Sequence, residues 1–170
     1  MKKLLLVLFI GLALSTSAFA DHPGDLGIGV VFGGGFGNYS GYWYPGLSLK
    51  LGKIPIFWSI YVPVFSHSLG LSVTGDFYFF DRSLVAKQMT NEDGTYNFKL
   101  DWYLGIGAST GAYFGNGGSA HIGVRFPVGL SWHVIRQFEI ALGIVPVFGV
   151  TIPPDFYWGL PLELTFRFWP

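Results

Sequence analysis

The chain has 170 residues, of which 51% are hydrophobic, 19% aromatic and only 12% charged, a more apolar composition than that of a typical soluble domain. Ten basic and ten acidic residues give no net charge, so the sequence lacks the basic surface of a nucleic-acid-binding protein. Because cysteine is absent, disulfide scaffolds, thiolate metal sites and cysteine nucleophiles are excluded. We expect one domain, with no nucleic acid among its partners.

The first twenty residues have the pattern of a secretory signal peptide. Lys2 and Lys3 precede the apolar run Leu4–Leu14, and small residues then lead to Ala20. This pattern predicts cleavage after Ala20, because the apolar run is too short for a stable spanning helix. An uncleaved anchor helix is the alternative, and the helix-breaking sequence that follows disfavours it. The expected organisation is a signal peptide (1–20), a short periplasmic segment (21–25) and one barrel domain (26–170).

From residue 26 onward, apolar residues alternate with glycine, hydroxyl-bearing or charged residues at a period of two, which is typical of β-strands. Helical spacing is not sustained in any segment of this region. The alternating runs are 26–32, 46–52, 56–65, 69–80, 100–109, 121–133, 138–148 and 159–169. These runs predict an all-β protein with eight antiparallel strands in up-and-down order.

The two faces of the predicted strands decide between a soluble and a membrane barrel. One face carries Leu, Ile, Val, Phe and Trp, and the other carries glycine, hydroxyl groups and charge. The polar face lacks the Lys and Glu coat that would make it a soluble surface. A closed transmembrane barrel needs strands of about ten residues that are apolar outside and polar inside. We predict an eight-stranded transmembrane β-barrel with a packed interior; a soluble periplasmic barrel is the alternative.

Charged residues on the polar face predict an ion-paired lumen. Short turns place Lys50 opposite Phe57, Phe57 opposite Asp76, Asp76 opposite Ser109, and Ser109 opposite Arg125 within about two residues. Glu163 lies within reach of a long basic side chain, and Glu139 falls almost opposite Arg167. Unpaired buried ions would cost several kcal/mol each. The expected lumen network is Lys50, Asp76, Arg125, Glu139, Glu163 and Arg167; a proton or ion pathway is the alternative.

Both chain ends are expected in the periplasm, as in other single-chain outer-membrane barrels. The link from Asp81 to Phe98 then lies on the periplasmic side and is longer than a tight turn. Its Asn91-Glu92-Asp93-Gly94 segment is a turn signal. We expect this link to be a hairpin that extends below the bilayer; a disordered loop is the alternative.

No residue pattern for catalysis or metal binding emerges from the sequence. His67, between Ser66 and Ser68, has no clearly placed carboxylate beside it and is expected to be a turn residue rather than a general base. His121 and His133 are expected to point inward, His133 roughly facing Asp101, and no histidine pair has ligand spacing. We therefore expect neither an enzyme nor a cofactor or metal site.

Aromatic residues near the strand ends are interpreted as the two interfacial girdles of a membrane barrel. The cluster from residue 39 to 44 lies at the outer girdle and could also recognise a partner at the cell surface. The candidate surface-recognition residues are Tyr39, Tyr42, Trp43, Tyr44 and His67.

Several short segments resemble known small outer-membrane barrels of the OmpX, OmpW and OmpA-transmembrane-domain kind, and more closely an uncharacterised spirochaetal surface-barrel family. The segments are 46–50, 102–108, 124–131, 138–140 and 145–146. The resemblance implies an outer-membrane location and insertion by the barrel-assembly machinery. The last strand, Leu162–Trp169, is similar to the signal that this machinery reads, although Pro170 replaces the usual terminal aromatic residue.

Members of such families are proposed as adhesins, host-factor binders or conduits for small apolar compounds. We expect an integral outer-membrane barrel with a closed, ion-paired lumen that acts as a structural or surface-interaction protein. A conduit for small or apolar molecules is the first alternative, and a barrel enzyme acting on lipid or peptide is the second. The expected partners are outer-membrane lipids, the assembly machinery, and host surface or serum proteins.

Overall fold

The computed structural model describes residues 26–38, 43–51, 55–65, 68–91, 94–115 and 118–170. Within them the chain forms strands and turns, which confirms the all-β class. The strands are β1 (Leu26–Gly37), β2 (Tyr44–Leu51), β3 (Ile56–Tyr61), β4 (Val64–Phe65), β5 (Ser68–Asn91), β6 (Gly94–Gly115), β7 (Ser119–Arg125), β8 (Val128–Ile135), β9 (Phe138–Ile144), β10 (Val147–Ile152) and β11 (Phe156–Phe168). The expected signal peptide (1–20) and N-terminal segment (21–25) lie outside the described residues.

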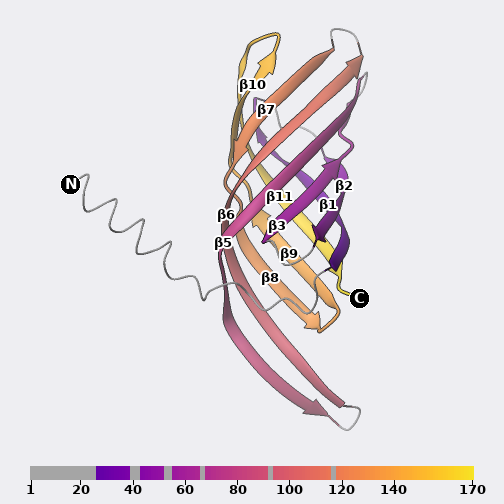
Figure 1. Ribbon diagram of the computed structural model, residues 1–170, viewed down its shortest axis with the longest axis vertical. Coiled ribbons are helices and arrows are strands. Elements are labelled where there is room, and N and C mark those ends of the chain that lie inside the picture. The colour runs from indigo at the N-terminus through magenta and orange to yellow at the C-terminus, as the bar shows by residue number, and fades with distance from the viewer. Residues whose placement is uncertain (1–25, 39–42, 52–54, 66–67, 92–93, 116–117) are drawn as a thin grey trace, which may run out of the picture.

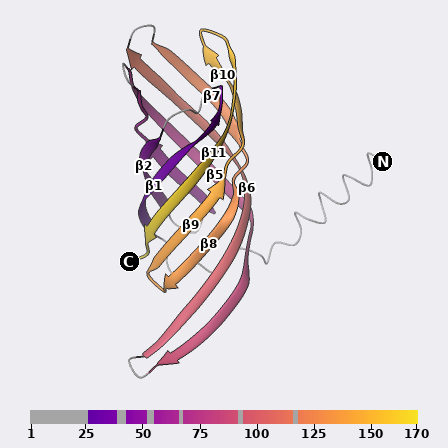
Figure 2. The same cartoon turned by 180° about the vertical axis from the view of Figure 1, so that it is seen from behind.

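All of these strands belong to one antiparallel sheet that closes on itself, so the fold is a β-barrel (Figures 1 and 2). β1 pairs with β2 on one side and with the last strand, β11, on the other. β6 pairs with β5 and also with both β7 and β8, while β11 pairs with both β9 and β10. Ten strands form the ring, and β4 pairs with β5 alone in the described sheet.

Three of the runs expected as single strands are interrupted at a proline. The interruptions separate β3 from β4 at Pro63, β7 from β8 at Pro127, and β9 from β10 at Pro146. Proline has no backbone N–H and so leaves a gap in the ladder, but its carbonyl oxygen still accepts a hydrogen bond. The carbonyl oxygens of the three interrupting prolines accept from backbone N–H groups: Gly70 N to Pro63 O (2.9 Å), Gly105 N to Pro127 O (2.8 Å) and Phe126 N to Pro146 O (2.9 Å). Pro161, within β11, accepts from Val145 N in the same way (2.9 Å).

The long link expected between Asp81 and Phe98 is a hairpin. β5 runs for 24 residues and β6 for 22, and their ladder continues as far as the pair Asn91–Gly94. We call the end of the barrel at which β1 begins and β11 ends the terminal end, and the opposite end the distal end. The hairpin extends past the other strands at the terminal end (Figure 1).

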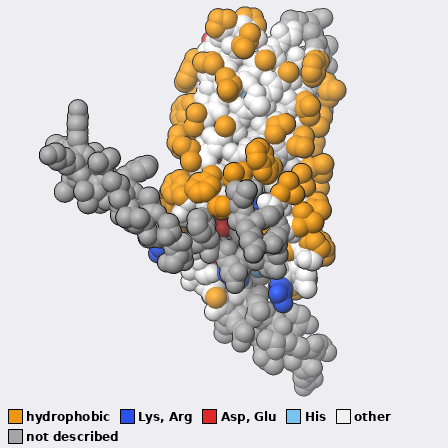
Figure 3. Space-filling model, viewed as in Figure 1, with side chains coloured by type: hydrophobic (Ala, Val, Ile, Leu, Met, Phe, Trp, Pro, Cys, Tyr) orange, Lys and Arg blue, Asp and Glu red, His pale blue; other side chains and the backbone are white. Residues whose placement is uncertain are grey.

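The polarity of the barrel is the inverse of that of a soluble protein. Side chains buried inside the ring include Asp101 (0% exposed), Glu139 (2%) and Arg125 (4%), whereas large apolar side chains such as Ile28 (47%) and Leu142 (47%) are exposed outside it. Figure 3 shows hydrophobic side chains spread over the outer wall. The alternation predicted from the sequence therefore sorts polar residues inward and apolar residues outward. Among the described residues, no helix is long and apolar enough to cross a membrane.

Candidate functional site

A buried three-residue cluster lies near the middle of the barrel. The guanidinium of Arg125 donates to Asp76 from Nε and Nη2, both at 3.0 Å, and to both carboxylate oxygens of Glu163 from Nη2, also at 3.0 Å. These side chains come from β7, β5 and β11, so the cluster ties together strands on different sides of the ring. With both carboxylates ionised, one guanidinium faces two negative groups, and the cluster has a net charge of minus one.

The expected residue between Asp76 and Arg125 was Ser109, and the structure corrects this to Gly107, which is opposite both. Counted from the turn at 91–94, an unbroken ladder would indeed place Asp76 opposite Ser109. Two β-bulges within residues 78–85 each add one residue to β5, which shifts the register by two. Glycine is needed here, because a Cβ atom on Gly107 would collide with the Asp76 carboxylate.

A second buried cluster, nearer the terminal end, is centred on Glu139. Arg167 lies directly opposite it in the ladder, in agreement with the expected pairing, and donates to both carboxylate oxygens at 2.8 Å. Ser131 Oγ (2.8 Å) and Trp169 Nε1 (2.9 Å) also donate to this carboxylate. Arg167 further donates to Ser48 Oγ at 2.9 Å. The Trp169 side chain, which is 1% exposed, is therefore packed into the lumen, whereas its neighbour Phe168 is 51% exposed.

Asp101 forms a third group of charged residues at the same end of the barrel. It lies 3.2 Å from Lys99 Nζ and 3.6 Å from His133 Nδ1, and it accepts a hydrogen bond from Ser83 Oγ at 2.6 Å. His133 is also 4.0 Å from Glu139, which connects this group to the second cluster. The inward orientation expected for His133, facing Asp101, agrees with this geometry.

A layer of aromatic rings fills the lumen close to the two arginine clusters. The rings of Phe57, Tyr78 and Tyr103 stack in sequence, with centroids 4.4 Å and 4.6 Å apart. Arg167 lies over the Phe57 ring at 4.6 Å, and the buried Lys50 ammonium is 6.0 Å from the same ring. Lys50 faces Phe57, as expected from the turn between β2 and β3. A void of about 20 Å³ lies between this layer and the charged clusters.

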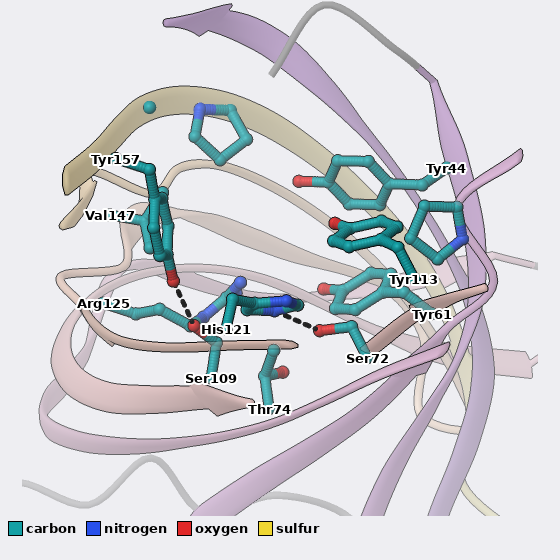
Figure 4. A pocket seen from close by; sticks show the side chains of 13 residues that line it. Tyr44, Tyr61, Ser72, Thr74, Ser109, Tyr113, His121, Arg125, Val147 and Tyr157 are labelled. Atoms are coloured by element: carbon teal, nitrogen blue, oxygen red, sulfur yellow. Dashed lines mark hydrogen bonds between the residues drawn. The ribbon is translucent and has the colours of Figure 1, made fainter. Parts of the chain in front are cut away.

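Distal to Arg125 the lumen widens into a cavity of about 80 Å³, which we call the cup (Figure 4). Arg125 forms its floor. Three tyrosines, Tyr44, Tyr61 and Tyr113, aim their hydroxyl groups into it from one side, and Tyr157 faces them from the other. His121 projects between the two walls, where its Nε2 lies 3.3 Å from Ser72 Oγ. The cup is therefore lined by rings and hydroxyl groups.

The structure divides the expected surface-recognition residues. Trp43 is 75% exposed, so it stays a candidate for surface recognition. Tyr44 does not: its hydroxyl points into the cup and lies 3.4 Å from Glu163 Oε1. The reason is parity, since Tyr44 is on the same face of β2 as the inward-facing Ser48 and Lys50. The other expected residues, Tyr39, Tyr42 and His67, lie outside the described residues.

The cup is the feature that the sequence analysis did not anticipate. Its tyrosines at 61, 113 and 157 occupy inward-facing positions near the distal ends of their strands. An aromatic residue on the otherwise polar face was the available signal, because a girdle residue would lie on the apolar face. In the described ranges, no group of three or more His, Asp or Glu residues is arranged to hold a metal ion.

Comparisons with known proteins add no relative: no protein-family model, curated protein or solved structure matches the chain. The role of the protein therefore has to be inferred from the geometry of the barrel wall and its interior.

Proposed function

We propose that this protein is an integral barrel of an outer membrane, with a sealed lumen, and that it acts as a structural or surface-interaction protein. The observation that carries the proposal is the inverted polarity of the closed sheet. In water, an outer wall of exposed Leu, Ile, Val and Phe would be unfavourable, and so would an interior of buried ions. In lipid the same outer wall is solvated, and a closed ring leaves no strand edge unpaired.

The strand count fits this proposal when each proline-interrupted pair is taken as one membrane crossing. β3 with β4, β7 with β8, and β9 with β10 then give eight crossings together with the five uninterrupted strands. An eight-stranded barrel has an interior just wide enough for its own side chains. The charged clusters and ring stack occupy the lumen in the way that such a narrow barrel requires.

A sealed lumen supports a structural or surface role over a conduit. Arg125 bridges carboxylates from two other strands, the Phe57–Tyr78–Tyr103 stack lies next to it, and Arg167 and Glu139 follow toward the terminal end. A solute that crossed the barrel would have to separate these buried ion pairs. Separating each pair would leave uncompensated charges inside the barrel, which is unfavourable. We therefore place the conduit and the barrel enzyme below the sealed barrel as alternatives.

The direction of insertion follows from the two ends of the barrel. β1 begins and β11 ends at the terminal end, from which the long β5–β6 hairpin also extends. We assign this end to the periplasm, because single-chain outer-membrane barrels keep both termini there. The distal end, with the exposed Trp43 and the cup, then faces outward, where host surface or serum proteins would be met. Outer-membrane lipids and the barrel-assembly machinery are the remaining proposed partners.

Two experiments test this proposal. In cell fractionation, the folded protein should be recovered with outer membranes and released by detergent; folded protein in the soluble periplasmic fraction would contradict a membrane barrel. In planar bilayers, the purified protein should add no stable conductance steps. Reproducible steps that follow the purified protein would contradict the sealed lumen and favour the conduit.

A further inference from the structure

We propose that the cup binds a neutral, hydroxyl-rich ring, such as the terminal sugar unit of a glycan. The inference deepens the proposed surface role by naming a ligand class. It rests on that proposal only for the side from which a glycan would arrive. The cup itself is defined by side chains from β2, β3, β5, β6, β7, β10 and β11, so it is a property of the folded barrel.

The charge of the floor favours a neutral occupant. Arg125 is the one charged residue among the described residues that line the cup, and its four hydrogen bonds are made to Asp76 and Glu163 beneath it. An anion would meet a cluster with a net charge of minus one, in which Nε and Nη2 of Arg125 are held by the two carboxylates and Nη1 alone is left to donate. A cation would meet the guanidinium before it reached the carboxylates. Both signs of charge are therefore disfavoured in this partly enclosed space.

The hydrogen-bonding groups of the cup favour an occupant with several hydroxyl groups. Four tyrosines, two serines and one threonine line it, and each hydroxyl can both donate and accept. Two of these residues, Tyr61 and Thr74, are each only 2% exposed; the Thr74 hydroxyl has no hydrogen-bond partner among the described residues, and the Tyr61 hydroxyl has only the Ser59 side chain beside it. Buried hydroxyl groups with unused hydrogen-bonding capacity are unfavourable, so a ligand that reaches these two supplies them with further bonds.

The rings and the size of the cup define the shape of the occupant. Tyr44 and Tyr61 pack edge to face with centroids 4.9 Å apart, and His121 packs edge to face with Tyr157 at 5.9 Å. The ring surfaces that line the cup provide apolar contact beside the hydroxyl groups, a combination typical of small-molecule sites. The cup volume, about 80 Å³, is about half that of the ~150 Å³ cavity that encloses benzene. A single sugar ring would therefore enter partly, with the rest of a glycan outside the barrel.

The test uses the mature chain folded in a zwitterionic detergent, because a sugar-headed detergent would compete for the cup. Saturation-transfer NMR is recorded with glucose, galactose and N-acetylglucosamine, and with glucuronate and glucosamine as charged counterparts. At least one neutral sugar should bind, and both charged sugars should bind more weakly than the neutral one of the same ring.

Matched variants locate the binding. Tyr61→Phe and Thr74→Val each remove one hydroxyl group of the cup with little change in volume, and each should weaken sugar binding about fivefold or more. Tyr78→Phe and Thr165→Val make the same chemical changes at the void of about 20 Å³ beside the ring layer, outside the cup, and should leave binding unchanged. All four variants should fold, because each change removes a single hydroxyl group and nearly preserves the side-chain volume.

Several results would overturn the inference. These are no binding of any neutral sugar, so that the cup holds water only; equal or tighter binding of a charged sugar; and equal loss in the cup variants and their controls. The proposed function fails separately. A barrel that conducts ions but binds the sugar would refute the sealed lumen alone, and a sealed membrane barrel that ignores sugars would refute the cup alone.

Discussion

The Arg125 cluster makes a quantitative prediction about stability. Arg125→Met removes all four hydrogen bonds to Asp76 and Glu163 and leaves two carboxylates next to each other in the lumen. The side chains involved are only 5%, 7% and 11% exposed, so solvent screens them little. Removing one partner of a buried ion pair costs about 3–5 kcal/mol. We therefore expect Arg125→Met to lower the free energy of unfolding by about this amount.

Removing one carboxylate of the cluster should lower the free energy of unfolding much less than removing the guanidinium. Glu163→Gln brings the net charge of the cluster to zero and leaves both bonds from Arg125 to Asp76 in place. We expect a loss of about 1 kcal/mol, typical of one weakened hydrogen-bonded interaction. The triple variant Arg125→Met, Asp76→Asn, Glu163→Gln has no buried charge at this level and should recover more than half of the loss seen for Arg125→Met alone.

The assay is urea-induced unfolding in detergent micelles, followed by tryptophan fluorescence, with heat-dependent gel mobility as an independent measure of the folded barrel. The wild type, the two single variants and the triple variant are compared at equal detergent concentration. Two outcomes would refute the reasoning. One is an Arg125→Met variant no less stable than Glu163→Gln, and the other is a triple variant as unstable as Arg125→Met.

Three further predictions concern the wall, the terminal end and the seal. Val128→Arg, near the middle of the outer wall, should lower folding stability in bilayers by about 2–4 kcal/mol, whereas Ile152→Arg near the distal rim should cost at most about 1 kcal/mol; equal costs would contradict a membrane-embedded wall. Trp169→Phe removes an indole N–H donor to a buried carboxylate and should cost about 1–3 kcal/mol in the urea assay, so an unchanged midpoint would argue against this bond. Changing Tyr78 and Tyr103 together to Ala should introduce conductance steps in planar bilayers that the wild type lacks, and a silent double variant would show that the ring stack is not part of the seal.

The sequence was sufficient to predict which face of each strand points inward, because alternation at a period of two sorts side chains without knowledge of their neighbours. Asp76, Arg125 and Glu163 could therefore be placed on one face. Their level along the barrel was harder to predict. It depends on the bulges within residues 78–85, and a bulge depends on both strands of a pair.

Aromatic residues show where prediction from a single chain fails. Tyr44 belongs to an aromatic cluster at a strand end, which predicts a surface position, although its parity points inward. Inward-facing glycines carry no signal of this kind in the sequence, yet Gly129 and Gly143 leave the space that the Tyr103 hydroxyl occupies, where a Cβ atom would collide. Such a pairing of a large ring with distant glycines appears only when the strands are assembled.

The proline interruptions have a mechanical consequence for the barrel. Backbone hydrogen bonds between neighbouring strands hold the ring together. Three residue pairs have one such bond instead of two, because proline cannot donate the second: Gly105–Pro127, Phe126–Pro146 and Val145–Pro161. In the proposed membrane no water would replace a missing bond, so the wall would be least stiff along this row. Shear of the cylinder would therefore concentrate between β7 and β10 on one side of the row and β8 and β9 on the other. The cup residues on β7 and β10 lie on the distal side of this row and Glu139 on β9 lies on its terminal side, while β11 runs past the row and joins the two parts.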